Sequence, residues 1–192
     1  MQLHTAQWDS ASGWPGPLPD GDGPNTLVIV FGGSSLLDDA GPLADVVAAY
    51  PTSCVIGCST AGEILGDLVH DDTVTLAVAR FSTTRLTLVS EAVHDAADSY
   101  AVGLSLGKRL LAWDPTTQAA FVLSDGLAVN GTKLVSGLVD GTEQGVLISG
   151  GLAADGPRFE RTWPSRGAVA RPTPPSVSWC ANTSGRSGRK KT

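Results

Sequence analysis

The chain of 192 residues contains few cysteines and no long apolar run. Its three cysteines, at positions 54, 58 and 180, lack the spacing of a metal site and form no disulfide framework. Such sparing use fits a reducing cytoplasm. Apolar runs such as residues 27–31 are far too short to cross a bilayer, and the first residues carry no basic segment before an apolar core. We therefore expect a cytoplasmic protein with no secretory signal, membrane span, metal or cofactor.

Basic residues are also scarce over most of the chain. Residues 1–156 hold five Lys and Arg against 18 Asp and Glu, a formal net charge of −13. An acidic surface repels phosphates, so nucleic acid is not an expected partner. Residues 157–192 instead hold eight basic residues and one acidic residue. A segment that binds an anionic partner and a segment of foreign origin both explain this basic end.

The composition is that of a globular domain, with 42% hydrophobic and 17% charged residues. We expect one domain over residues 25–163, after an irregular lead-in over residues 1–24 that is rich in Trp, Pro and Gly. Residues 164–192 are rich in Pro, Ser, Arg and Gly and show no periodicity. Their low apolar content predicts a low-complexity, disordered tail.

The patterns of apolar residues predict an α/β fold with a mixed β-sheet flanked by helices. A hairpin through residues 82–85 is the simplest link between two adjacent expected strands, which makes the sheet mixed. The expected strands cover residues 27–31, 53–57, 73–81, 86–93, 119–124 and 145–149, and the expected helices cover residues 42–50, 95–113 and 133–139.

Two βαβ-like units of similar spacing are visible. A shift of 93 positions superposes residues 27–31 on 120–124 and residues 55–57 on 148–150, with a helical segment between them in both cases. An internal repeat explains this match, and so does chance similarity between two ordinary α/β units. In either case, we expect the loops that follow the second strands to lie at corresponding ends of the sheet.

The first of these loops, residues 57–63, concentrates polar chemistry. As a ligand loop it would offer backbone amides beside Gly57 and Gly62, the thiol of Cys58, two hydroxyls and a carboxylate, the last three from Ser59, Thr60 and Glu63. As a plain strand-to-helix turn, Thr60 and Glu63 have the spacing of a capping box. For Cys58, burial as a small thiol is a simpler interpretation than a nucleophile, because no histidine accompanies it in a motif.

Further candidates follow the later strands. Ser124 and Asp125 end the expected strand at 119–124, and Asn130 is a candidate N-cap whose alternative role is ligand binding. Gly150 and Gly151 end the last strand. Arg161 is a candidate partner for a ligand carboxylate, with Glu63 and Asp125 for an ammonium group. Residues 32–35 lack the Lys of a phosphate-binding loop, so nucleotide binding is not expected.

Three of these motifs resemble the N-terminal domain of the FIST family. They are Gly-Cys-Ser-Thr-Ala-Gly-Glu-Ile at residues 57–64, Phe-Val-Leu-Ser-Asp-Gly at 121–126, and Gly-Gly-Leu-Ala at 150–153, and the likeness covers residues 25–163. The resemblance implies an intracellular sensory domain of signal transduction that binds a small ligand such as an amino acid. It also implies a second FIST domain or a signalling output domain as a partner.

The resemblance ends where the expected tail begins. A family member should continue past residue 163 into another strand, whereas this chain turns to basic low-complexity sequence, as a truncated or frameshifted product would. We expect a sensor without catalytic activity. Two alternatives remain, namely an enzyme that uses Cys58 or Glu63 and an assembly module that uses an exposed sheet edge.

Overall fold

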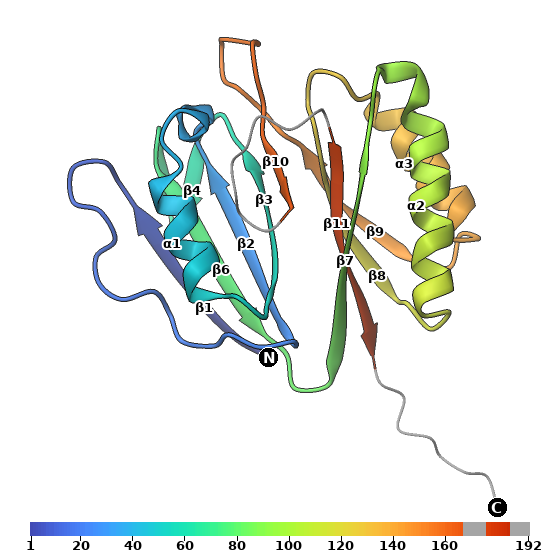
Figure 1. Cartoon of the computed structure of the whole chain (residues 1–192), viewed down its shortest axis with the longest axis horizontal. Helices are drawn as coiled ribbons and strands as arrows, with labels where there is room; N and C mark the ends of the chain where they lie inside the picture. The colour runs from blue at the N-terminus through green and yellow to red at the C-terminus, as the bar shows by residue number, and fades with distance from the viewer. Residues whose placement is uncertain (167–175, 185–192) are drawn as a thin grey trace, which may run out of the picture.

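The computed structural model describes residues 1–166 and 176–184 of the chain (Figure 1). The first half contains β1 (Gln2–Trp8), β2 (Thr26–Gly32), η1 (Ser34–Leu37), α1 (Gly41–Ala49), β3 (Cys54–Ser59), β4 (Glu63–Leu65), β5 (Leu68–His70) and β6 (Val74–Arg80). The second half contains β7 (Thr84–Ala92), η2 (Ala96–Asp98), α2 (Ser99–Trp113), β8 (Ala119–Ser124), α3 (Gly131–Gly141), β9 (Leu147–Leu152), β10 (Pro164–Arg166) and β11 (Ser176–Ser184).

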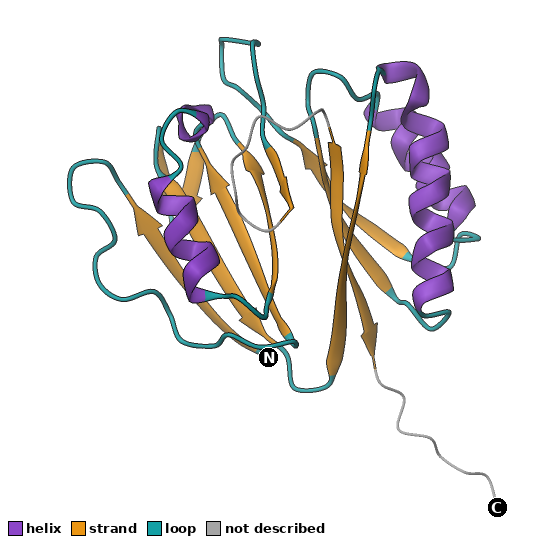
Figure 2. Ribbon diagram, in the orientation of Figure 1, coloured by secondary structure: helices purple, strands orange, loops and turns teal. Residues whose placement is uncertain are grey.

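The strands form two mixed sheets and one small hairpin. The first sheet has the order β1-β6-β2-β3-β10, the second has the order β7-β11-β8-β9, and β4 pairs with β5. Figure 2 shows α1 on the outer face of the first sheet and α2 with α3 on the outer face of the second. The predicted α/β class with mixed pairing and flanking helices is therefore confirmed, but the mixed sheet is two sheets stacked between helices.

Alternation along β2 shows how the layers are built. Val28 and Val30 are fully buried and pack with Leu43 and Val46 of α1. The intervening side chains, such as Ile29, point the other way and join the cluster between the two sheets, because successive residues of a strand face opposite sides. A run of apolar residues in sequence thus marks a strand that is covered on both faces.

The prediction of a hairpin between the strands at 73–81 and 86–93 is wrong. β6 lies between β1 and β2 in the first sheet, whereas β7 pairs with β11 in the second. Residues 81–83 therefore carry the chain from one sheet to the other, as the lower part of Figure 1 shows. The local sequence predicts β6, β7 and the turn between them, but the partners with which the two strands pair lie far away in the sequence.

Each sheet contains one parallel pair of strands joined through a helix. β2 and β3 pair in parallel around α1, and β8 and β9 pair in parallel around α3. In the first pair Val30 lies opposite Gly57, and in the second Val122 lies opposite Gly150. That the two units are an internal repeat remains a prediction.

The expected boundaries need correction at both ends. The lead-in is not irregular throughout, because residues 2–8 form β1, which pairs with β6 along its whole length. The tail is not without structure either, since β10 pairs with β3 and β11 lies between β7 and β8. The expectation of disorder for residues 167–175 and 185–192 falls outside the described residues.

Candidate functional site

The stretch at residues 57–63 is not the continuous loop that its sequence suggests. Gly57, Cys58 and Ser59 belong to β3 and are buried, and the turn begins only at Thr60. No helix follows the turn, because β4 begins at Glu63 and forms a hairpin with β5. Both predictions for this stretch, a loop from Gly57 onward and a helix capped by Thr60 and Glu63, are therefore wrong.

Thr60 and Glu63, which have the spacing of a capping box, nevertheless form a hydrogen bond with each other. The Thr60 hydroxyl donates to Glu63 Oε1 at 2.5 Å, and the backbone amide and hydroxyl of Thr73 both donate to Oε2 at 3.0 Å. Glu63 is only 1% exposed. A buried carboxylate needs such donors, so the Glu63 side chain holds the turn against the start of β6.

A pocket of about 380 Å³ opens beside this turn, and we call it the loop pocket. It lies beyond the carboxyl ends of the parallel strands β2 and β3, the usual position of ligand sites in sheets of this kind. Its lining comprises Gly33, Thr60, Ala61, Gly62, Glu63, Asp71, Asp72, Gly156, Pro157 and Arg158.

One wall of the loop pocket comes from the segment between β9 and β10, which is pinned to the first sheet. Trp163 is buried there, and its indole Nε1 donates to the carbonyl oxygen of Gly33 at 3.0 Å. The Trp163 backbone amide donates to Ser59 Oγ at 3.1 Å, and the Ser59 amide donates to the Trp163 carbonyl at 2.9 Å. The segment therefore carries a rigid link from the second sheet to the first.

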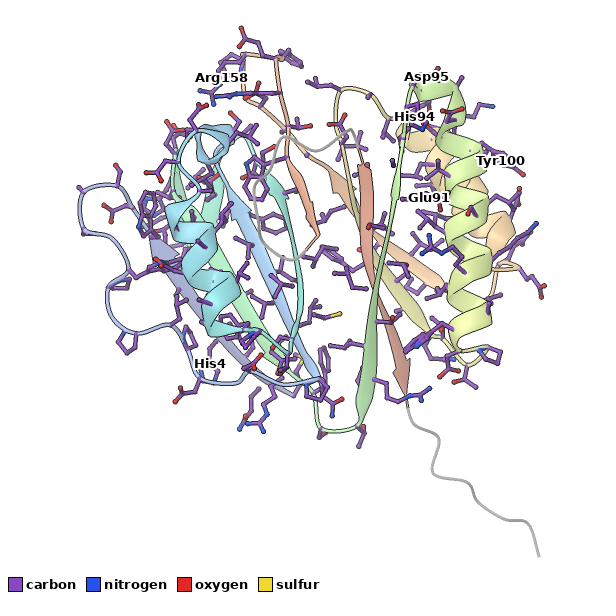
Figure 3. All side chains as sticks on the ribbon, in the orientation of Figure 1. His4, Glu91, His94, Asp95, Tyr100 and Arg158 are labelled. Carbon is purple, nitrogen blue, oxygen red and sulfur yellow. The ribbon has the colours of Figure 1, made fainter. Side chains whose placement is uncertain are left out.

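Arg158 brings a positive charge to this wall. Figure 3 shows it on the segment above the first sheet. Its Nε donates to Asp155 Oδ1 at 3.1 Å and its Nη2 donates to Ser34 Oγ, while about half of the side chain stays exposed. Two bonds from the guanidinium thus fix its position and leave charge facing solvent at the pocket.

The carboxylate of Asp155 accepts several hydrogen bonds from the segment between β9 and β10. Burial by itself would raise the pKa of Asp155, but hydrogen bonds from Ser34, from the backbone amides of Arg161 and Glu160 and from Arg158 lower it to about 2. The two backbone amides lie 3.0 and 2.9 Å from Oδ2. The carboxylate is therefore charged at all ordinary pH values and holds Arg158 in place.

The lining of the loop pocket also includes two acidic residues. Asp71 and Asp72 follow β5 and are both exposed. Asp72 adopts a positive φ of 53° and accepts a hydrogen bond from the Ser35 hydroxyl at 3.3 Å. The pocket lining thus contains both carboxylates and a guanidinium.

Cys58 lies away from this pocket, in the layer between the sheets with Ile56 and Leu123. It is 2% exposed, and burial raises the pKa of its thiol to about 12. A thiol with such a pKa is protonated at neutral pH and is a poor nucleophile.

The candidate residues after β8 hold backbone turns. Asp125 Oδ1 accepts hydrogen bonds from the amides of Leu127 and Ala128, and Oδ2 accepts one from the Thr162 hydroxyl. Asn130 caps α3, as predicted, by accepting a hydrogen bond from the Lys133 amide at 3.0 Å. Neither side chain lines the loop pocket.

The remaining candidate residues also lie outside the loop pocket. Ser124, Gly150 and Gly151 line a separate groove between α3 and β9. Arg161 makes a bidentate ion pair with Asp38 at the surface, and its guanidinium is not part of the pocket lining. Of the predicted site residues, Thr60, Gly62 and Glu63 come together in the loop pocket.

Sequence reasoning missed three charged residues of the loop pocket, namely Arg158, Asp71 and Asp72. Arg158 lies three positions before Arg161 and, like it, pairs with an aspartate, so the sequence alone does not tell which of the two arginines lines the pocket. Asp71 and Asp72 follow a hairpin that is absent from the strands and helices expected from the sequence, so their placement beside Thr60 was not predicted. Consecutive aspartates after a short apolar segment were the available signal.

The family model for the FIST N domain matches residues 26–171. The match extends past residue 163, where the resemblance was expected to end. No curated protein matches the chain.

Two structural features bear on cofactors and membranes. Across residues 1–166 and 176–184, no group of three or more His, Cys, Asp and Glu side chains is placed to hold a metal ion. In the same residues, no helix combines the length and the apolar character needed to span a bilayer.

Proposed function

Because the chain belongs to the FIST family, we propose that it is a sensory domain of signal transduction that binds a small zwitterionic metabolite, such as an amino acid, in the loop pocket. The observation that carries the proposal is that the lining of one pocket contains both a guanidinium, from Arg158, and two carboxylates, from Asp71 and Asp72. A carboxylate of the ligand would bind Arg158, and an ammonium group would bind the aspartates.

The size and position of the pocket support this proposal. A volume of about 380 Å³ falls in the lower part of the range found for small-molecule sites. The Thr60 hydroxyl oxygen and the backbone of Gly62 are further polar groups in the lining. Glu63 is not assigned to the ligand, because both of its carboxylate oxygens already accept hydrogen bonds from Thr60 and Thr73.

The proposed activity is binding without catalysis. The buried, protonated thiol of Cys58 favours this over a cysteine enzyme. The pocket also joins the turn after β3 in the first sheet to the segment that leaves β9 in the second. A ligand that contacts both would favour one arrangement of the two sheets, and a second FIST domain or an output domain would respond to that shift.

Thermal unfolding of the purified protein against a panel of amino acids and related metabolites tests the proposal. A ligand present at 100 times its dissociation constant should stabilise the fold by about 2.7 kcal/mol. Failure of the whole panel to raise the melting temperature of a cooperatively folded protein would contradict the proposal.

Variants of two neighbouring arginines then locate the site. Arg158→Gln should weaken the affinity for the bound amino acid by about 10- to 100-fold in calorimetry, because it removes charge-assisted bonds. Arg161→Gln is the matched control, since Arg161 is paired with Asp38 outside the pocket. Asp72→Asn should weaken binding of the amino acid but not of its deaminated carboxylate analogue. Equal losses in Arg158→Gln and Arg161→Gln would refute the assignment.

A further inference from the structure

The outer edge of β9 is open in the second sheet. The strand order ends at β9, and within residues 1–166 and 176–184 no other strand pairs with it on that side. None of its six residues is buried, and Leu147 and Leu152 are 71% and 48% exposed. In β3, which occupies the corresponding place in the first sheet, five of six residues are buried and β10 pairs with the outer edge.

Some backbone amides of β9 point away from β8, towards the open edge. The amides of Leu147 and Ala153 donate inward, to the carbonyl oxygens of Gln118 and Ser124 at 2.9 and 2.7 Å. Because amide directions alternate along a strand, the amides at positions 148, 150 and 152 point to the open side. They form a row of hydrogen-bonding groups of the kind that recruits another strand.

The same surface lacks charge. Residues 144–154 contain no Asp, Glu, Lys or Arg, although the chain as a whole has a formal net charge of −6. The adjoining groove of about 330 Å³ between α3 and β9 is also uncharged. It is lined by Val122, Ser124, Gly131, Leu134, Val135, Leu138, Ile148, Ser149, Gly150, Gly151 and Leu152. Edge strands that stay single usually carry charges, prolines or bulges, and β9 carries neither charge nor proline.

We propose that β9 is a dimer interface, at which two copies of the chain pair antiparallel along this edge. Two-fold symmetry requires an antiparallel arrangement of two identical strands, and β10 meets β3 in that same direction. The symmetry axis passes beside Gly150, so that Ile148 of one copy lies opposite Leu152 of the other. The two second sheets then form one continuous sheet. The inference is independent of the loop pocket and of its ligand.

A second copy fits this edge better than an unrelated partner does. Two acidic molecules repel each other over most of their surfaces, so contact is least costly where both are uncharged. The β9 edge is such a surface, and in a two-fold dimer it meets its own copy. Pairing also covers Leu152 beside the groove, and apolar area removed from water stabilises the contact.

The proposal predicts the mass of the particle in solution. Light scattering coupled to size exclusion, over about a hundredfold range of protein concentration, should show a particle of twice 19.7 kDa that dissociates on dilution. A monomer over the whole range would overturn the proposal, including the case in which the edge serves a different protein.

Charged residues of opposite sign, introduced at Ser149 in two separate variants, test the interface itself. In the proposed register, the two Ser149 side chains lie on one face as diagonal neighbours about 7 Å apart. Ser149→Lys and Ser149→Glu should each raise the dissociation constant of the dimer by about tenfold or more, because like charges meet. An equal mixture of the two variants should recover the dimer.

The control lies on the other open edge. Leu3 of β1 is 57% exposed at the edge of the first sheet, and Leu3→Lys should leave the dimer unchanged. Circular dichroism and urea unfolding of each variant establish that it is folded. Dissociation by Leu3→Lys rather than by the Ser149 variants would overturn the assignment to β9, as would a mixture that fails to recover the dimer.

Discussion

The two parallel strand pairs of this protein have the same topology and different surroundings. β3 and β9 each follow a helix, each pair in parallel with the preceding strand, and each place a glycine opposite a valine. β3 is buried, paired on both sides and followed by a polar turn that lines a pocket, whereas β9 is exposed and followed by alanines. Two units of the same topology therefore differ in burial and pairing, and the segments that neighbour them make the difference.

The segment between β9 and β10 packs on the unit formed by β2, α1 and β3, and Trp163 anchors it there. The unit formed by β8, α3 and β9 has no described counterpart of this segment. Trp163→Ala should lower the free energy of unfolding by about 3–5 kcal/mol, because it empties a fully buried site and removes one of the two donors to the carbonyl of Gly33. Urea unfolding measures the loss. Trp113→Ala is the control, since Trp113 is 39% exposed and its ring lies under the guanidinium of Arg85. Equal effects at the two tryptophans would mean that the segment does not secure the first unit.

Each unit has a glycine opposite a valine, and both glycines lie close to the backbone of that valine. A Cβ at Gly57 would lie 2.5 Å from the carbonyl oxygen of Val30, and one at Gly150 would lie 1.8 Å from that of Val122. Gly150 also has a φ of 146°, which a residue with a side chain rarely adopts. We expect Gly150→Ala to cost about 3 kcal/mol and Gly57→Ala about 2 kcal/mol of unfolding free energy.

Gly151 provides the control for this pair of variants. No atom lies within 4 Å of a Cβ built there, so Gly151→Ala should change the unfolding free energy by less than about 0.5 kcal/mol. Denaturation at low protein concentration keeps association out of the measurement. A larger loss at Gly57 than at Gly150 would show that the exposed strand tolerates distortion that the buried strand does not.

The protonation of Asp155 should govern how the stability changes at acid pH. Its pKa is lowered to about 2 in the folded state from 3.8, so its contribution is complete above pH 4 and is lost as the pH falls towards 2. Asp155→Asn should cost about 2 kcal/mol at pH 7 and should flatten the decline of stability between pH 4 and 2. Unfolding curves across that range measure both effects.

An exposed aspartate supplies the control for this experiment. Asp67 lies in the turn of the hairpin between β4 and β5, and Asp67→Asn should leave both the stability and its pH dependence nearly unchanged. If Asp155→Asn behaved in the same way, the hydrogen bonds to Asp155 would not be a source of stability.

Much of the fold was predictable because its strands and helices have strong local patterns. The alternation at residues 74–80 and the apolar run at residues 27–31 gave correct strands, and Asn130 gave a correct cap. The failures concern pairing over long distances. β1 combines polar residues with an exposed edge, so its signal is weak, and nothing local shows that β6 and β7 belong to different sheets.

The candidate site was predicted in part, for a related reason. Thr60 and Glu63 form the hydrogen bond that their spacing favours, but the same spacing serves a turn before a hairpin as well as a helix start. Arg158 reaches the pocket only because a segment from the second sheet crosses to the first. A contact of that kind, between residues about a hundred positions apart, leaves no periodic mark in either segment.

The place of β11 between β7 and β8 has a consequence for the order in which the protein folds. In the first sheet, the strand that joins β1 to β2 is β6, so these three strands are complete once residue 80 has been synthesised. In the second sheet, residues 84–92 must wait for residues 176–184 before they gain their partner. On a ribosome, β1, β2, β3 and β6 can therefore assemble early, before β10 of the same sheet is made. Meanwhile β7 stays unpaired for roughly half of the synthesis, which leaves it open to aggregation.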